Sequence, residues 1–257
     1  MTTSQFSVDG KTVIVTGSSQ GIGRSIVERF ANDGANVVVT SRDLEKVESV
    51  AESINGGEAD GQAIAVECDV RDRDSIQALV DATVEEFGQL DCLVNNAGAS
   101  FMADFDDISA NGWKTIVDIN LHGTFHCSQI AGQQMQSQGD GGTIVNFASV
   151  AGQQGSQKMP HYGAAKAAVI NFTKSLAAEY ASHDIRVNCI APGLVATPGV
   201  ASQMGIEGPG DIDRSEVDRT FGRPVEIADL TQFLASEASS YMIGETVTIK
   251  GKPQMEE

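Results

Sequence analysis

A tyrosine and a lysine lie four residues apart in the run PHYGAAKAAV, residues 160–169. On a helix this spacing places Tyr162 and Lys166 on one face, within reach of each other. A free phenol titrates near ~10, and a neighbouring cation favours the phenolate and lowers its pKa. The pair therefore has the residue types of a proton donor and acceptor that works near neutral pH. An ordinary helix start with a surface lysine is the alternative, and these ten residues alone leave both open.

Two polar residues nearer the N-terminus can act with this pair. Ser149 lies just past the apolar run at 143–147, and its hydroxyl can hydrogen-bond and polarise a substrate oxygen. Asn120 lies in the helix-like segment DINLHG, residues 118–123. Taken singly, Ser149 also fits a serine that satisfies backbone groups at a strand end, and Asn120 also fits a polar residue on a helix face.

The first apolar run, TVIVT at 12–16, leads directly into TGSSQGIG at 16–23 and then into a segment of helical periodicity. Glycines let a backbone turn tightly and approach a pyrophosphate, and the N-terminus of the next helix offers free N–H groups and a positive dipole end. The spacing is T-G-x-x-x-G-x-G instead of the standard G-x-G-x-x-G. Strand, glycine loop and helix in this order predict a dinucleotide pocket at the end of the first strand.

Seven short apolar runs must form the frame that positions these residues. Several are rich in Val and Ile and nearly continuous, which is typical of strands buried on both faces of a sheet. Longer segments with helical spacing lie between them. We predict an α/β fold with a doubly wound parallel sheet of about seven strands and helices on both faces. The runs are TVIVT (12–16), NVVVT (36–40), AIAVE (63–67), DCLVN (91–95), TIVNF (143–147), IRVNCI (185–190) and ETVTI (245–249).

Residues 194–224 break this alternation. Gly and Pro are frequent there, the charges are mixed and the apolar periodicity is weak. A long segment of this kind, between the sixth strand and the last helix, is often a lid or a binding loop. No linker, repeat or low-complexity tract divides the chain, so we expect a single domain over residues 1–257 with a substrate lid at about 194–224.

Taken together, these motifs resemble the classical short-chain dehydrogenases/reductases over nearly the whole chain. TGSSQGIG is similar to the cofactor loop of that family, NNAG at 95–98 to its fourth-strand motif, and PGLVAT at 192–197 to its nicotinamide-side motif. The resemblance implies a Rossmann-type fold and a catalytic tetrad of Asn120, Ser149, Tyr162 and Lys166. The cofactor contacts that it implies are Gly17, Ser19, Gln20, Gly21, Ile22, Gly23, Ser41, Arg42, Asp69, Val70, Asn96, Ala97, Gly98, Tyr162, Lys166, Pro192, Gly193, Val195 and Thr197.

Within this family resemblance, each polar residue receives a role. Tyr162 would be the general acid in ketone reduction and the general base in alcohol oxidation. Lys166 would lower the pKa of the phenol and bind the ribose hydroxyls, and Asn120 would support a water chain to Lys166. Asp69 is similar to the family's contact to the adenine edge, although an N-cap for the next helix is nearly as good an interpretation.

The end of the second strand, Thr40-Ser41-Arg42, bears on the choice between NAD and NADP. NAD sites commonly place an acidic residue there, on the ribose 2′-hydroxyl, and NADP sites use a basic residue nearby. Ser41 stands where the family's NAD enzymes usually carry Asp, and Arg42 can hold a 2′-phosphate through paired N–H donors. We predict NADP; the alternative is that Arg42 is a solvated surface charge and that the enzyme takes either NADP or NAD. Asp43 is expected to cap the helix that begins there.

The resemblance leaves the substrate open. Similar members of the family reduce 3-oxoacyl thioesters or oxidise sugars at C1. Many reductases that use an acyl carrier protein have arginines near the ends of the long helices, whereas the matching stretches here, 132–138 and 176–180, contain no basic residue. Docking of an acidic carrier on an acidic surface is unfavourable. We therefore expect a 3-oxoacyl reductase-like enzyme acting on a coenzyme A thioester, and a homotetramer by resemblance. A sugar 1-dehydrogenase and a non-catalytic nucleotide-sensing scaffold are the alternatives.

Two features near the C-terminus affect the substrate side. Three arginines, Arg214, Arg219 and Arg223, lie in or just after the 194–224 segment and can meet a phosphate or pair with nearby acids. The family usually ends its last strand with Asp-Gly-Gly, whereas this chain has Lys250, Gly251 and Lys252. The acids available to the arginines are Asp211, Asp213, Glu216 and Asp218.

The charge balance excludes some classes of partner. Lys and Arg number 17 and Asp and Glu 35, so the formal net charge is −18, and the pI is about 4.4. Such a surface repels nucleic acid and anionic membranes. No run reaches the ~18 apolar residues of a membrane helix, and the start MTTSQFSVDG has no secretory pattern, so we expect a cytoplasmic protein with a small-molecule substrate. The acid excess indicates a halophilic protein, with an ordinary acidic protein as the alternative.

Neither the cysteines nor the histidines form a strong metal motif. The cysteines contain no C-x-x-C, so we expect buried free thiols. His122 and His126 are four apart on a predicted helix and could form a metal pair, but no carboxylate arrangement supports one, and no metal is expected. The four cysteines are Cys68, Cys92, Cys127 and Cys189.

Overall fold

The computed structural model describes residues 4–204, 210 and 212–251, and these residues contain one sheet of seven parallel strands in the order β3-β2-β1-β4-β5-β6-β7. The predicted doubly wound sheet is confirmed, and each predicted run contains a strand whose ends differ by at most two residues from the expectation. The strands are β1 (Thr12–Thr16), β2 (Asn36–Ser41), β3 (Ala63–Glu67), β4 (Cys92–Asn95), β5 (Gly142–Phe147), β6 (Ile185–Pro192) and β7 (Thr246–Ile249).

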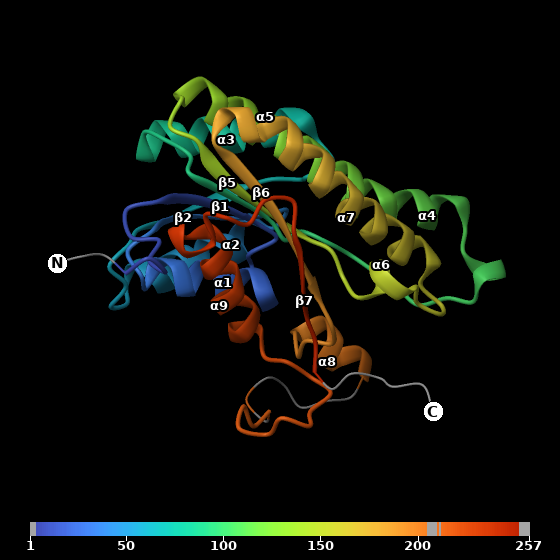
Figure 1. The fold of residues 1–257 in the computed structure, drawn as a ribbon. Coiled ribbons are helices and arrows are strands. Elements are labelled where there is room, and N and C mark those ends of the chain that lie inside the picture. Colours follow the sequence, from blue (N-terminus) through green and yellow to red (C-terminus); the bar gives the residue numbers. More distant parts are fainter. Residues whose placement is uncertain (1–3, 205–209, 211, 252–257) are drawn as a thin grey trace.

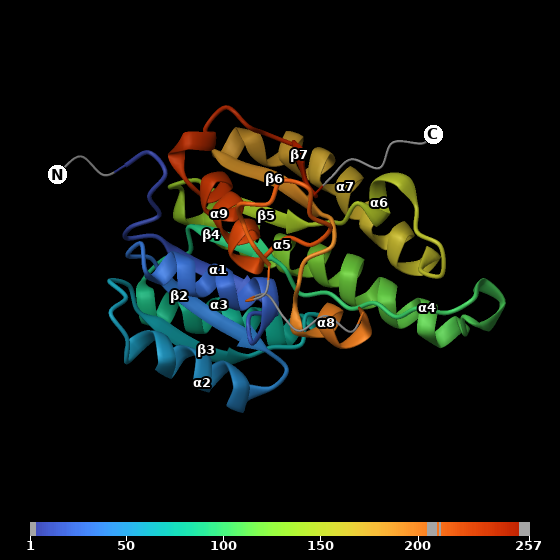
Figure 2. The same cartoon turned by 90° about the horizontal axis from the view of Figure 1, so that it is seen from below.

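Helices cover both faces of the sheet (Figure 1). Helices α1, α2 and α9 pack on one face, and α3, α5 and α7 pack on the other. Figure 2 shows α4, α6 and α8 on the side where the strands end. The helices are α1 (Gly21–Ala31), α2 (Leu44–Asn55), α3 (Arg73–Phe87), α4 (Ala110–Val117), α5 (Gly123–Gln138), α6 (Ala151–Gln154), α7 (Pro160–Tyr180), α8 (Pro198–Met204) and α9 (Pro224–Ala235), with shorter turns at Phe105–Asp107, Asp118–His122, Ala181–His183 and Glu237–Ser239.

Two apolar clusters bury the sheet from both sides. In β1, Val13 and Val15 belong to the cluster formed with α1, α2 and α9, whereas Ile14 belongs to the cluster formed with α3, α5 and α7. Successive side chains of a strand point to opposite faces, so a strand buried on both faces needs an apolar residue at every position. This is why the strands could be recognised as nearly continuous apolar runs.

Local signals at the helix ends are mostly those expected. Asp43 caps α2 by accepting a hydrogen bond from the Lys46 backbone N–H at 3.3 Å. Pro160 occupies the first turn of α7, where a missing N–H has no helical partner to lose. Asp72 caps α3, accepting from the Asp74 N–H at 3.0 Å, so the interpretation of Asp69 as that N-cap is wrong.

The 194–224 segment leaves and rejoins the body of the fold at one place. The Gly222 N–H donates to the Leu194 carbonyl and the Ala196 N–H donates to the Gly222 carbonyl, both at 2.9 Å. Helix α8 forms the first part of the excursion, and residues 205–209 and 211 lie outside the described part of the chain. Within the described residues, no helix is both long enough and apolar enough to cross a membrane.

Candidate active site

The main pocket opens at the carboxyl ends of the strands and has a volume of about 540 Å³. It lies where the chain order of the sheet reverses between β1 and β4, which is the usual place for ligands in doubly wound folds. Loops that follow β1 to β6 all contribute to it. The predicted site residues that line it are Gly17, Ser19, Gln20, Gly21, Ile22, Ser41, Arg42, Asp69, Val70, Asn96, Ala97, Gly98, Ser149, Tyr162, Lys166, Pro192, Gly193, Val195 and Thr197.

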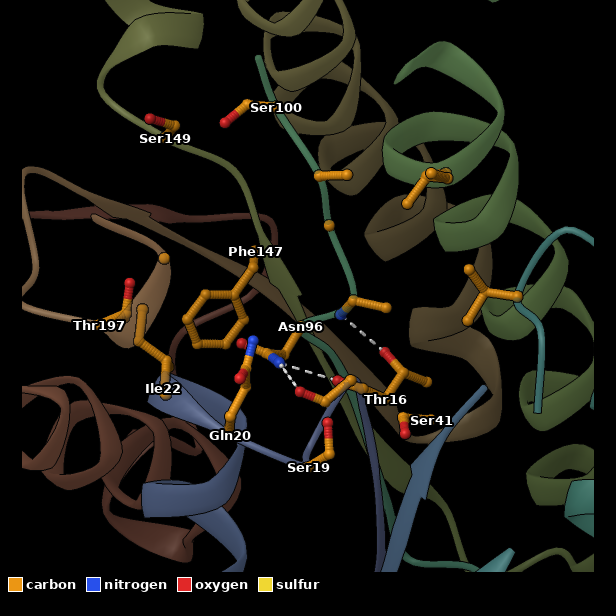
Figure 3. Close-up of a pocket in the computed structure, with 18 of the residues that line it drawn as sticks. Thr16, Ser19, Gln20, Ile22, Ser41, Asn96, Ser100, Phe147, Ser149 and Thr197 are labelled. Carbon is orange, nitrogen blue, oxygen red and sulfur yellow. Dashed lines mark hydrogen bonds between the residues drawn. The ribbon is translucent and has the colours of Figure 1, made fainter. Parts of the chain in front are cut away.

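The loops after β1 and β4 are tied together at the centre of the pocket (Figure 3). The Asn96 side-chain amide donates to the Thr16 carbonyl at 2.8 Å and to the Gly17 carbonyl at 3.0 Å, and the Ala97 N–H donates to Thr16 Oγ1 at 3.0 Å. Gly17 has a φ of +66°, and a Cβ there would lie 2.9 Å from Ala97 Cα. Gly23 does not line the pocket; a Cβ at Gly23 would lie 2.5 Å from the Asn96 amide, so this glycine serves close packing.

The start of α1 fits the pyrophosphate of a dinucleotide. Its N-cap residue, Gln20, makes no side-chain capping hydrogen bond within the described residues, so the Gln20 side chain does not occupy the first N–H groups of the helix. Gly21, with a φ of +59°, turns the chain into the helix. Free N–H groups and the positive end of the helix dipole favour an anion at this place. The pocket volume is also in the usual range for cofactor sites.

The far end of the pocket contains Arg42 and Asp69. Arg42 follows Ser41 at the end of β2 and is exposed, while Ser41 Oγ accepts a hydrogen bond from the Asp43 N–H at 3.2 Å. The Asp69 carboxylate accepts hydrogen bonds from the Arg71 guanidinium, with Nε 2.9 Å from Oδ1 and 3.1 Å from Oδ2. These bonds hold the pKa of Asp69 below its usual value, and the positive charge of Arg42 acts in the same direction.

The opposite end of the pocket is lined by Tyr162, Lys166 and Ser149. Lys166 is 3% exposed, and its ammonium lies 5.6 Å from the centroid of the Tyr162 ring. Lys166 Nζ donates to the Phe147 carbonyl at 2.7 Å, and burial lowers the pKa of Lys166 to about 8. Burial raises the pKa of Tyr162, and a hydrogen bond with Ser149 opposes that rise. The pKa of this phenol therefore lies above its usual value, whereas the sequence-based expectation was that Lys166 would lower it.

Asn120 lies behind the pocket wall, in the π-helical turn between α4 and α5. Its amide donates to the Ala99 carbonyl at 2.8 Å and to the Ile116 carbonyl at 2.9 Å, and its buried Oδ1 has no hydrogen-bond partner among the described residues. A Cβ at Gly98 would lie 2.9 Å from Asn120 Oδ1 and 3.6 Å from Lys166 Nζ, so Gly98 keeps open the space between the two. An unpaired buried oxygen beside this space fits a bridging water.

The nicotinamide-side motif is in contact with the atypical C-terminus. A Cβ at Gly193 would lie 2.7 Å from Lys250 Cβ, and a Cβ at Gly251 would lie 2.1 Å from the Arg219 carbonyl.

The arginines of the 194–224 segment pair with α9: Arg219 hydrogen-bonds Glu226, and Arg214 lies 3.7 Å from the same carboxylate. Asp213 was one of the acids expected as a partner, and the positive charge of Arg219 is among the causes that lower its pKa. Glu226 was not expected as a partner from the sequence.

Two functional positions were missed from the sequence. Thr16 Oγ1 accepts a hydrogen bond from the Ala97 N–H, and the Phe147 carbonyl accepts one from the Lys166 ammonium. Both are the last residues of parallel strands, so the rule that ligands bind at carboxyl strand ends could have identified them.

His161 is fully buried against Phe101, with ring centroids 4.2 Å apart, and neither of its nitrogens has a partner in the described part of the chain.

The other singled-out residues do not form a metal site. His122 Nδ1 lies 3.0 Å from Asp118 Oδ1, and its ring centroid is 6.5 Å from that of His126. Among the residues that the structure describes, no group of three or more His, Cys, Asp or Glu could hold a metal ion. The four cysteines are buried and free.

Known proteins match this architecture closely. The short chain dehydrogenase family model matches residues 11–205. A 3-oxoacyl-[acyl-carrier-protein] reductase of Staphylococcus aureus is 37% identical, covering 94% of this chain and 97% of the relative. A Bacillus subtilis protein named as a probable 2,4-dienoyl-CoA reductase is 36% identical, covering 95% and 96%. A solved 7α-hydroxysteroid dehydrogenase, complexed with NADH and 7-oxo glycochenodeoxycholic acid, is 32% identical with a TM-score of 0.88, covering 98% of this chain and 97% of that one.

The match over most of the chain places the protein in a family. The chain belongs to the short-chain dehydrogenases and has their Rossmann-like fold. It is an oxidoreductase acting on CH–OH groups and the corresponding ketones.

Proposed function

From this family membership and the geometry of the pocket, we propose that the chain is an NADP(H)-dependent reductase of 3-oxoacyl thioesters of the coenzyme A type. The observation that carries the catalytic part is the meeting of Tyr162, Ser149 and Lys166 beside a glycine loop that fits a dinucleotide. The cofactor, when bound, supplies or accepts the hydride. The protein must then hold the carbonyl and deliver one proton to its oxygen.

Tyr162 is proposed to deliver that proton. Because burial raises its pKa, the phenol is protonated at neutral pH and can act as a general acid in reduction. Ser149, which shares a hydrogen bond with Tyr162, is placed to polarise the same substrate oxygen. Lys166 has one hydrogen bond within the described residues, to Phe147, and an ammonium has three donors, so the others can bind ribose hydroxyls.

The preference for NADP is supported by Arg42. It lines the pocket at the end of β2, is exposed, and no acidic residue stands at Ser41 to bind a 2′-hydroxyl. A guanidinium can bind a phosphate through two parallel N–H donors. The similar hydroxysteroid dehydrogenase is complexed with NADH, so NAD is the alternative cofactor for this chain. The remaining predicted cofactor contacts, the glycine loop and the residues from Asn96 to Gly98 and Pro192 to Thr197, serve either cofactor.

A coenzyme A ester is supported by two observations. The Staphylococcus reductase is named for a 3-oxoacyl group carried on acyl carrier protein, which supports the 3-oxoacyl part, and the Bacillus relative is named for a coenzyme A ester, which supports the coenzyme A part. The acidic balance of this chain, 35 acidic against 17 basic residues, disfavours docking of an acidic carrier protein. We further propose that residues 194–224 act as a lid, since α8 within them contributes Pro198, Gly199 and Val200 to the pocket wall.

Assembly and setting are also proposals. A homotetramer is proposed from the family resemblance, with the Lys250–Gly251 end altering its detail. Four free cysteines support a reducing compartment, and we propose the cytoplasm. The acid excess supports adaptation to high salt, where screening reduces self-repulsion. Urea unfolding in dilute buffer and in concentrated KCl tests this, and equal stability in both would contradict it.

One panel experiment tests the proposed function. Ketones, acyl-CoA esters and sugars are assayed with NADPH, NADH and the oxidised forms at high and low salt. We expect the highest kcat/KM for a 3-oxoacyl-CoA with NADPH. Faster oxidation of a sugar would favour the sugar dehydrogenase instead, and no binding of either nicotinamide cofactor would overturn the assignment of the pocket.

A further inference from the structure

Asp69 and Arg42 both line the pocket, at the end that receives the loops after β2 and β3. The charge of Arg42 helps to lower the pKa of Asp69, so the two groups influence each other electrostatically. Opposite charges in such positions tend to pair. Arg42 nevertheless forms no ion pair with Asp69 in the described part of the chain; the partner of Asp69 is Arg71.

Arg71 donates hydrogen bonds to both carboxylate oxygens of Asp69. Its Nε donates to both oxygens of Asp69 at 2.9 and 3.1 Å, its Nη2 donates to Oδ2, and its backbone N–H donates to Oδ1 at 3.0 Å. A guanidinium that grips a carboxylate through two N–H groups fixes its orientation as well as neutralising it. Arg71 itself does not line the pocket, so it acts on the cofactor site only through Asp69.

We propose that Arg71 is a positioning residue for cofactor choice: by holding both carboxylate oxygens of Asp69, it leaves Arg42 free to bind a 2′-phosphate. This inference rests on the proposed preference for NADP. Without the Arg71 side chain, the Asp69 carboxylate would attract the Arg42 guanidinium and repel the anionic 2′-phosphate. Both effects weaken binding of NADP, while NAD, which lacks the phosphate, is little affected.

The test compares binding of NADP⁺ and NAD⁺ by isothermal titration calorimetry to the intact chain and its variants. For Arg71→Gln we expect the Kd of NADP⁺ to rise about fivefold, the range of a partly exposed ion pair, and the Kd of NAD⁺ to change less than about twofold. Arg73→Gln is the matched control, because it removes an exposed arginine two residues away, whereas the ion pair of Asp69 among the described residues is with Arg71. It should leave both Kd values unchanged.

A second variant separates this role from a merely structural one. In Arg71→Gln/Asp69→Asn the carboxylate that would capture Arg42 is absent, so the ratio of the NADP⁺ and NAD⁺ affinities should return to within about twofold of the unmodified chain. A structural defect would persist in the double variant. The fivefold effect should also shrink in ~1 M salt, because exposed charges are then screened.

The outcomes distinguish the two proposals. Equal or tighter binding of NAD⁺ by the unmodified chain overturns the NADP preference, and this inference with it. A ratio of the NADP⁺ and NAD⁺ affinities that is unchanged in Arg71→Gln, or that falls there and is not restored in the double variant, overturns the role of Arg71 alone.

Discussion

Two cations at opposite ends of the sheet are removed from water in different ways. Arg186, at the amino end of β6, donates five hydrogen bonds to Thr143 Oγ1, Ser239 Oγ and the carbonyls of Leu234, Ser236 and Ser239. Lys166, at the carboxyl end, donates one hydrogen bond within the described residues, to Phe147. Burial lowers the pKa of both, that of Lys166 to about 8.

The difference separates a structural charge from a functional one. Arg186 joins β5 and β6 to the end of α9, and its donors are used by the fold. Lys166 keeps donor capacity for a ligand and is surrounded by little that compensates its charge, which costs stability. A buried charge with unfilled hydrogen-bonding capacity, in a pocket, is therefore the better indicator of function.

The largest effect is expected from Tyr162→Phe, which removes the proposed proton donor but not a charge. Activity with a ketone and NADPH should fall about 10³-fold, while the Kd of NADPH changes little. Initial rates and fluorescence titration measure both. Tyr180→Phe, the same substitution on the same helix, is the control and should keep its activity. More than a tenth of the original rate in Tyr162→Phe would rule out the phenol as the proton donor.

Arg186→Met tests the structural half of the comparison. The carbonyls of Leu234, Ser236 and Ser239 lose a donor, so the free energy of unfolding should fall by about 3 kcal/mol. The kcat of the folded fraction should not change. Urea unfolding and kinetics at low temperature check this. Arg29→Met, which breaks only the exposed pair with Asp229, serves as the control and should cost less than about 1 kcal/mol.

The pH dependence of stability tests the functional half. The pKa of Lys166 is about 8 in the folded chain and 10.5 as its reference value, so the unfolded chain binds more protons between these two values. The contribution of Lys166 to stability therefore rises with pH across this window, by about 2 kcal/mol between pH 8 and 10. The measurement is the unfolding free energy of the unmodified chain minus that of Lys166→Met at several pH values. A difference independent of pH would show that the amine is not perturbed by burial.

The smallest effect is expected from Gly98→Ala. The new methyl would lie 2.9 Å from Asn120 Oδ1 and fill the space between this oxygen and Lys166. We expect about a tenfold loss of kcat, since a positioned water is displaced while the charged groups remain. Unchanged kcat would argue against a water between Asn120 and Lys166.

The sequence predicted the parts of the fold that depend on repeating local patterns. Strands buried on both faces are continuous apolar runs, and the motif positions around Tyr162 and Gly17 fall into one pocket as expected. Contacts between distant segments were not predictable. Three such contacts depend on side-chain directions that no periodicity encodes. They are the hydrogen bonds of Arg71 to Asp69, the pairing of Arg219 with Glu226, and the hydrogen bond from Lys166 to the Phe147 carbonyl.

The pKa of Tyr162 shows the same limit. The spacing of Tyr162 and Lys166 correctly placed them near each other, but it carried no information on how deeply the phenol is buried. Desolvation depends on every element around the ring, so its effect could be judged only from the assembled structure.

The most direct test of the comparison is Lys166→Met, measured at pH 7 for both activity and stability. Ketone reduction should fall at least ~10²-fold. The free energy of unfolding should not fall; it should rise by about 1 kcal/mol, because removing a buried charge stabilises the fold by more than the lost hydrogen bond to Phe147 destabilises it. A loss of several kcal/mol, as expected for Arg186→Met, or retention of activity, would contradict this account.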